Sequence, residues 1–195
     1  MTELAYPVAK LFPLQGQWTE SDYLALETNK LTELSKGRLE VLELPSYFHQ
    51  AMVGRLFFAL TLFLKQRLLG KVCIAPLRVK LGEDHYREPD VMFMSLEHKD
   101  RIHQKHWDAP DLVVEIVSPD DPDRDYIAKR KEYAQAGIAE YWIIDPEVNA
   151  VEVLVLGSSM DTYDPAYVIT DEGMLTSKQL PGFEISIVEL FAPEK

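Results

Sequence analysis

One acidic residue, Glu115, lies inside the otherwise apolar segment 112–117. A short run rich in Leu, Val and Ile predicts a strand that is buried on both faces. An unpaired carboxylate in such a strand would cost several kcal/mol, or its pKa would rise until the group was neutral. Glu115 therefore requires a cation, a metal ion or a hydrogen-bond network, unless one face of the strand is open to solvent.

Two further residues have types and positions that fit the same site. Asp90 stands at the start of the apolar segment 91–94, where it is well placed to meet a carboxylate from a neighbouring strand. Lys129 shares one helix face with Asp125 and Tyr133, because the three residues are spaced by four. Taken alone, Asp90 fits a turn or strand-entry residue. For Lys129, an exposed ion pair with Asp125 explains the spacing as well as a site role does.

Two carboxylates and one lysine form a chemically sensible set for phosphodiester hydrolysis. The hard oxygen ligands of Asp90 and Glu115 suit Mg²⁺ or Mn²⁺, which holds a phosphate oxygen and lowers the pKa of a bound water. The ammonium group of Lys129 would orient that water or offset charge that develops on phosphorus. The set predicts a metal-dependent phosphodiesterase site with one or two metal ions.

The segments around these residues predict a mixed α/β chain. Apolar residues recur at helical spacing over 47–69, with Gly70 as a helix stop, and indicate the major core helix. Strand-like segments follow at 72–81, 89–94 and 112–117, and we expect them to share one sheet.

Further elements are predicted on both sides of this central part. A second long helix is expected over 123–136, between Pro122 and Gly137. A short capped helix is expected over 22–27 and a strand over 39–44. The strand-rich C-terminal part is predicted at 141–144 and 151–156, and more weakly at 167–170 and 183–188.

Composition limits the classes of protein that the chain can belong to. The 195 residues are 47% hydrophobic and 27% charged, which is typical of a globular protein and predicts one domain over 1–195 with an irregular arm over 1–18. The net charge of −12 argues against a protein that coats nucleic acid, because non-specific binding comes from Lys and Arg. A localised basic groove is still compatible with this charge.

Several classes of site and location are disfavoured by the sequence. The first 18 residues show no signal-peptide pattern, and the longest apolar run, 56–64, is far shorter than the roughly 20 residues of a membrane span, so we expect a cytoplasmic protein without a membrane segment. Neither a Gly-rich phosphate loop nor a serine-hydrolase elbow is present. His103 and His106 have the spacing of metal ligands, but they lie in a charged stretch without a nearby Cys, so zinc is not expected there.

These motifs together resemble the PD-(D/E)XK nuclease superfamily, which has the restriction-endonuclease-like fold. The resemblance rests on Asp90 after a proline, Glu115 in its apolar strand and Lys129 on the next helix. It is most specific toward a bacterial subfamily of restriction endonucleases whose function is not established, and it spans about 23–191. The motifs that carry this narrower resemblance are Gly37-x-x-Glu40, His49, Asp125-x-x-x-Lys129-x-x-x-Tyr133, Gly137 and the segments 110–119 and 140–146.

The resemblance implies a central mixed β-sheet flanked by helices and a Mg²⁺- or Mn²⁺-dependent deoxyribonuclease. Asp90 and Glu115 would be the metal ligands, and Lys129 the catalytic lysine. The superfamily pattern places this lysine two residues after the acidic ligand, where this chain has Val117. The role must therefore be supplied by Lys129 from the helix.

Glu40 and His49 are additional candidate site residues. Glu40 matches an acidic position of the subfamily, although Glu43 competes for the same role and either one fits a solvated strand residue as well. His49 lies near the start of the long helix, where a capping residue or a hydrogen-bonded polar residue competes with a base as the interpretation.

The expected partner is DNA, bound through a local basic groove, and a homodimer is expected by analogy with the superfamily. Basic residues that would flank the site are Arg87, Arg124, Arg130 and Lys131. The alternative hypothesis is a non-catalytic interaction protein, or a subunit of a complex, that retains the nuclease fold. The acidity of the chain and the lack of a recognised DNA-binding motif favour this alternative.

Overall fold

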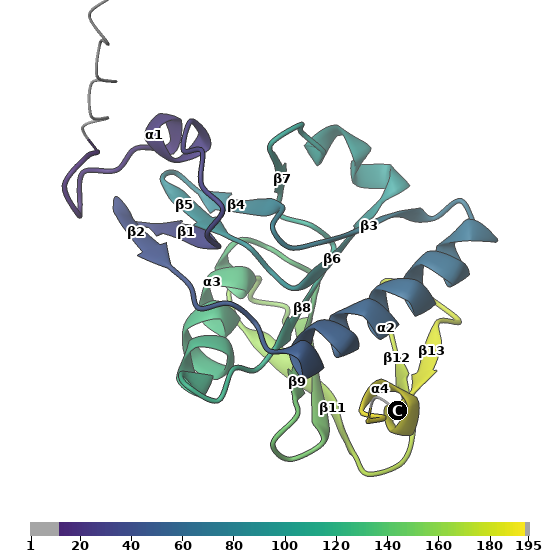
Figure 1. Cartoon of the computed structure of the whole chain (residues 1–195). Helices are drawn as coiled ribbons and strands as arrows, with labels where there is room; N and C mark the ends of the chain where they lie inside the picture. The colour runs from purple at the N-terminus through teal and green to yellow at the C-terminus, as the bar shows by residue number, and fades with distance from the viewer. Residues whose placement is uncertain (1–11, 194–195) are drawn as a thin grey trace, which may run out of the picture.

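The computed structural model describes residues 12–193. The larger of its two main sheets lies at the centre of the fold (Figure 1). Its strands are β3 (Gly70–Ile74), β6 (Val91–Ser95), β8 (Leu112–Ile116), β9 (Glu140–Asp145), β10 (Ala150–Leu156) and β11 (Tyr163–Thr170). They are ordered β11-β10-β9-β8-β6-β3, with β8 and β9 parallel and all other neighbours antiparallel. A mixed sheet flanked by helices confirms the predicted fold class.

The second sheet consists of five short strands. They are β1 (Thr32–Ser35), β2 (Arg38–Val41), β4 (Arg78–Gly82), β5 (His85–Arg87) and β7 (His106–Asp108), in the order β2-β1-β5-β4-β7. β1, β5 and β7 were not expected from the sequence. They have three or four residues each and include polar side chains, so they lack the apolar alternation that predicts a strand.

The prediction of a single strand over 72–81 in one shared sheet is wrong. The chain turns at Ala75 and Pro76, so β3 pairs with β6 in the larger sheet while β4 joins the second sheet. Pro76 has no backbone N–H for a ladder hydrogen bond, which explains why pairing ends there.

The predicted core helix is present as α2 (Tyr47–Lys65), and it ends four residues earlier than expected. Met52, Leu56 and Leu60 recur every four residues and are fully buried in the main core. Gly70 begins β3 and does not stop the helix. This position requires glycine, because a Cβ there would lie 2.1 Å from the backbone oxygen of Met94. Within 12–193, α2 is also the one helix long and apolar enough to cross a membrane by length and composition alone.

The second predicted helix has two parts. Residues Arg124–Lys129 form a π-helix, η2, and Arg130–Gln135 form an α-helix, α3. An α-helix was expected throughout, but the sequence pattern does not reveal the wider i→i+5 turns of a π-helix, which are frequent at functional sites. Gly137 follows with φ of 78°, as predicted for a residue just beyond a helix end.

The remaining elements lie near the two ends of the described chain. α1 (Glu20–Leu24) is capped by Thr19, as expected, and ends three residues early. The predicted strand 183–188 is divided, because only its first part forms β13 (Glu184–Ser186) before the chain enters α4 (Ile187–Leu190). The other elements are the 3₁₀-helix η1 (Leu96–Arg101) and β12 (Met174–Thr176), which pairs with β13.

Two apolar clusters cover the two faces of the larger sheet. Along β8, Val114 and Ile116 join the cluster that contains the buried side of α2, while Val113 joins the cluster that contains Tyr133 of α3. Successive strand residues point to opposite faces, so Glu115 shares the face of Val113. This alternation directs the Glu115 carboxylate toward η2 and α3.

Candidate active site

The structure brings Asp90 and Glu115 together at the neighbouring ends of β6 and β8. β6 begins opposite Val114 of the antiparallel β8, so Asp90, one residue before β6, lies beside Glu115. The Asp90 carboxylate is fixed by the backbone N–H of Ile116, which donates to Oδ2 at 2.7 Å. The predicted meeting of two carboxylates from adjacent strands is therefore present.

Lys129 reaches this pair from η2. Its Nζ lies 3.0 Å from Oε2 of Glu115 and 2.9 Å from Oδ1 of Asp125, and all three side chains are buried. The interpretation of Asp125 and Lys129 as an exposed surface pair is therefore wrong, since the pair forms in the interior. Lys129 therefore brings an ammonium group to Glu115 from the helix, although Val117 occupies the usual position of the lysine.

Glu115 is held by a second partner and has an unusual protonation equilibrium. The Tyr133 hydroxyl donates a hydrogen bond to Oε1 of Glu115. Burial raises the pKa of Glu115 to about 8, with Lys129 opposing this effect and the neighbouring Asp125 and Asp90 adding to it. Burial also raises the pKa of Asp125. Burial and crowding make both carboxylates easier to protonate, and added positive charge opposes this effect.

His49 belongs to the same cluster. Its Nε2 lies 2.8 Å from Oδ1 of Asp90. The capping role is taken by Ser46, whose hydroxyl accepts a hydrogen bond from the backbone N–H of His49. His49 is therefore a hydrogen-bonded residue beside the carboxylate pair, where it orients the Asp90 carboxylate.

Glu40 and Glu43 lie in different places. Glu40, on β2, is 3.1 Å from Arg87 and 2.9 Å from Arg124, whereas Glu43 lines the pocket that contains Asp90. The structure therefore brings Glu43, and not Glu40, to the carboxylate pair.

Glu33 was missed in the sequence, although it is the most buried acid of the second sheet. Arg87 and Arg124 both pair with its carboxylate. Burial alone would raise the pKa of Glu33, but Lys129, Arg87 and Arg124 lower it to about 2. No local signal marks this residue, because its partners are far away in the sequence.

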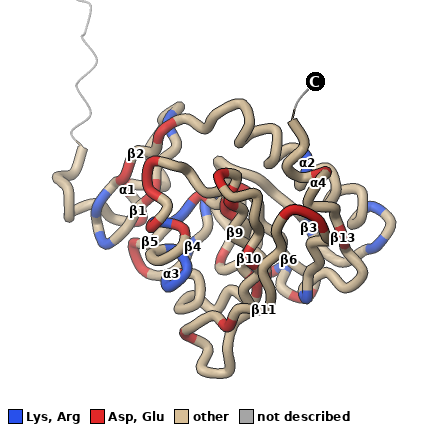
Figure 2. Tube along the Cα trace, turned by 90° about the horizontal axis from the view of Figure 1, so that it is seen from below, with Lys and Arg blue, Asp and Glu red and all other residues tan. Residues whose placement is uncertain are grey.

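The residues expected to form a basic groove are largely engaged with acids. Arg87 is buried between Glu33 and Glu132, and Arg130 pairs with Glu152. Figure 2 shows basic and acidic stretches next to each other around β1, β5 and α3. Arg87 is inaccessible to a nucleic acid in this arrangement, which corrects its expected role.

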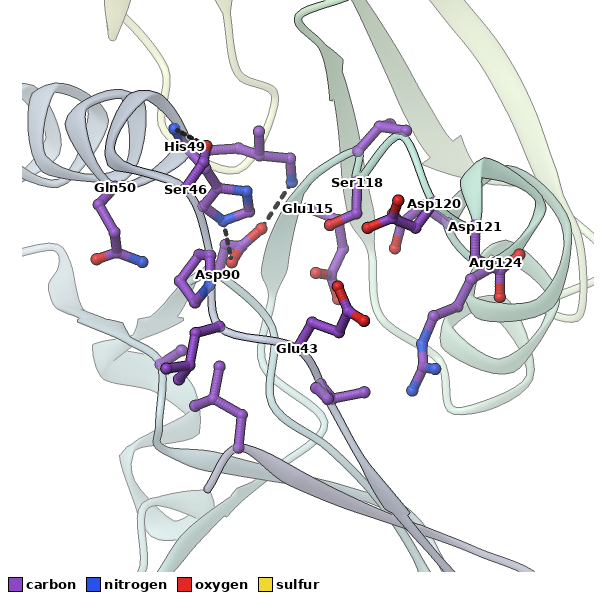
Figure 3. A pocket seen from close by; sticks show the side chains of 18 of the residues that line it. Glu43, Ser46, His49, Gln50, Asp90, Glu115, Ser118, Asp120, Asp121 and Arg124 are labelled. Carbon is purple, nitrogen blue, oxygen red and sulfur yellow. Dashed lines mark hydrogen bonds and ion pairs between the residues drawn. The ribbon is translucent and has the colours of Figure 1, made fainter. Parts of the chain in front are cut away.

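A pocket of about 700 Å³ opens beside the cluster. Figure 3 shows the carboxylates of Glu43, Asp90 and Glu115 directed into it, opposite a loop that carries Asp120 and Asp121. Of the described residues that line it, seven are acidic and two, Arg124 and Lys129, are basic. This excess of hard oxygen donors fits a divalent cation such as Mg²⁺ or Mn²⁺.

Comparisons with known proteins identify the family of the chain. The family whose description reads "Uma2: Putative restriction endonuclease" matches residues 20–188. This chain belongs to the Uma2 family. The match confirms the resemblance to restriction-endonuclease-like proteins.

The fold of this Uma2 protein is also similar to a solved structure. A crystal structure described as a putative nuclease belonging to DUF820, from Anabaena variabilis, aligns with a TM-score of 0.73 and 21% sequence identity. The alignment covers 89% of the Uma2 chain and 97% of the other chain, so the whole fold is shared. No curated protein matches the sequence.

Proposed function

We propose that this Uma2 protein is a divalent-metal-dependent nuclease that hydrolyses DNA phosphodiester bonds. The observation that carries the proposal is one pocket in which Asp90 and Glu115 lie at adjacent strand ends and Lys129 lies 3.0 Å from Glu115. Membership of a family described as putative restriction endonucleases supports the same reaction class.

Asp90 and Glu115 would hold the metal ion, with Glu43 available as a further oxygen donor from the pocket wall. When bound, Mg²⁺ or Mn²⁺ would supply Lewis-acid polarisation of a phosphate oxygen and favour deprotonation of the attacking water. The acidic pocket itself repels phosphate, so binding of a phosphodiester requires this added positive charge.

The surrounding residues would position the two carboxylates and the ammonium group. His49 holds one oxygen of Asp90, while the Tyr133 hydroxyl holds one oxygen of Glu115. Lys129, kept charged by Glu115 and Asp125, would orient the attacking water or stabilise negative charge on the phosphate. These contacts keep the reacting groups in place before substrate arrives.

Asp90→Asn tests the proposal, and Asp111→Asn is its matched control. Asp111 has the same kinds of contact as Asp90, because one oxygen accepts from a backbone N–H at 2.7 Å and the other lies 2.6 Å from a histidine nitrogen. Unlike Asp90, it does not line the pocket. We expect Asp90→Asn to weaken Mn²⁺ binding, measured by calorimetry, by at least about tenfold. It should also abolish metal-dependent cleavage of supercoiled plasmid, which Asp111→Asn retains. Equal effects of the two substitutions would reject the proposal.

The second candidate function is a non-catalytic interaction protein with the nuclease fold. It is favoured by the partners of Glu115, because Lys129 and Tyr133 engage both of its oxygens within the protein itself. Folded wild-type protein that neither binds Mn²⁺ nor cuts plasmid or single-stranded oligonucleotides would support this alternative. The homodimer, the DNA-binding groove and the cytoplasmic location stay predictions.

A further inference from the structure

A tight turn before β7 brings two histidines together on the side of the second sheet. The backbone N–H of His103 donates to the carbonyl oxygen of His106 at 3.0 Å, and Ile102 and Trp107 form an antiparallel bridge. The two imidazole rings are 4.7 Å apart between centroids and inclined by 40°. The backbone of the turn therefore places both rings on one side.

Asp108 adds a carboxylate to this pair. It lies two residues after His106 on β7, so strand alternation directs both side chains to one face. Its Oδ2 is 2.9 Å from Nε2 of His103, and its Oδ1 is 3.3 Å from Nε2 of His106. One potential ligand atom from each of the three residues lies within 4.8 Å of the others. We refer to these three residues as the β7 triad.

The protein holds the β7 triad in place. Trp107, between two members of the triad, is buried in the core, and β7 pairs in parallel with β4. The His106 ring packs edge-on against Tyr86, with centroids 5.6 Å apart. Nδ1 of His106 and Oδ1 of Asp108 are buried and make no hydrogen bond within the protein. Since buried polar atoms nearly always have a partner, the Asp108 oxygen has a lone pair available to a metal ion, whereas Nδ1 of His106 is on the other side of its ring from the nitrogen that faces Asp108.

We propose that the β7 triad binds one Zn²⁺ ion, or a divalent first-row metal of similar ligand preference, through two imidazoles and a carboxylate. Imidazole nitrogen is a preferred ligand of Zn²⁺, whereas Mg²⁺ prefers oxygen ligands. None of the three residues lines the pocket of Asp90 and Glu115, so this is a second and chemically different metal site. The ion would tie the turn at His103 to the edge strand β7.

The site was not expected from the sequence because two histidines in a charged stretch are a weak signal. The third ligand, Asp108, and the strand that orders His106 are visible only in the folded chain. A simple hydrogen-bonded cluster in which Asp108 accepts from His103 is the competing explanation. It predicts no metal binding.

Zinc binding is measured by calorimetry in excess Mg²⁺, which occupies oxygen-rich sites. His103→Ala and Asp108→Asn remove exposed or partly exposed ligands, and His98→Ala is the control, because His98 pairs with Asp111 at 2.6 Å outside the triad. We expect wild type and His98→Ala to bind one Zn²⁺ equally, and the two triad variants to bind at least about tenfold more weakly while keeping the wild-type circular dichroism spectrum. Unchanged zinc affinity in both triad variants, or no binding by wild type, would overturn the proposal.

X-ray absorption on the zinc-loaded protein distinguishes the triad from the acidic pocket. Two imidazole nitrogens at about 2.0–2.1 Å from zinc are expected in wild type and in Asp90→Asn, and a reduced histidine signal is expected in His103→Ala. An all-oxygen shell in wild type would place zinc elsewhere and reject the proposal.

Discussion

At the residue scale, Lys129 is the charge on which the candidate site depends. It is buried between Glu115 and Asp125, and both contacts are shorter than 3.1 Å. A buried ion pair gains little over apolar packing, but removal of one member leaves a charge without compensation. In the proposed function, the pair supplies an ammonium group to the pocket.

Lys129→Met tests the cost of removing this charge, and Lys131→Met is the matched control at an exposed position of the adjoining helix α3. We expect Lys129→Met to lower the free energy of unfolding by about 3 kcal/mol, because two buried carboxylates lose their cation. The control should change it by less than about 0.5 kcal/mol. Urea unfolding measures both values, and equal midpoints for the two variants would contradict this role of Lys129.

At the element scale, ion pairs tie the β1–β2 hairpin to the helix that carries Lys129. Glu33 on β1 and Glu40 on β2 both pair with Arg124 of η2. Arg87 of β5 joins Glu33 to Glu132 of α3. The hairpin therefore fixes the orientation of the helix segment at the site from outside the larger sheet.

Acid titration should reveal these ion pairs. The folded-state pKa of Glu33 is about 2, below its ordinary value of 4.5, so the folded state binds fewer protons than the unfolded chain between these values. Its stabilisation is complete above about pH 4.5 and is lost as pH falls toward 2, with a magnitude of about 3 kcal/mol. We expect urea midpoints to fall steeply over this range for wild type and less steeply for Glu33→Gln. Parallel curves would contradict this prediction.

At the scale of the whole molecule, the chain carries a net charge of −12 and concentrates seven carboxylates around one pocket. Mutual repulsion of these groups in the folded state is relieved by a bound cation. Metal binding should therefore be linked to the stability of the entire chain, since ligands from separate strands are joined.

Thermal unfolding measures this linkage. At a concentration 100 times the dissociation constant, Mn²⁺ should raise the free energy of unfolding by about 2.7 kcal/mol and increase the Tm. At the same concentration, Asp90→Asn should gain at most about 1.4 kcal/mol if it binds Mn²⁺ at least tenfold more weakly. NaCl of equal ionic strength should not reproduce the effect on wild type. A Tm that rises equally with Mn²⁺ in wild type and Asp90→Asn would exclude Asp90 as a ligand.

The sequence alone determined the elements whose signal is local. Residues close together in the sequence predict α2 by their helical spacing and β8 by their apolar character. In the same way, Gly137 marks the end of the helix before it. Glu115 was recognisable as a buried carboxylate that needs partners for the same reason, because a carboxylate in an apolar strand is anomalous wherever the strand lies.

Only the tertiary structure decided which distant groups meet. Glu33 is 54 residues from Arg87 and 91 from Arg124, so its burial and lowered pKa depend on contacts that no local pattern contains. The same holds for Asp108, which becomes a candidate ligand once the turn places His103 beside it. Short polar strands gain their stability from pairing with strands that are distant in the sequence. The site residues on such strands can therefore be identified only when that pairing is known.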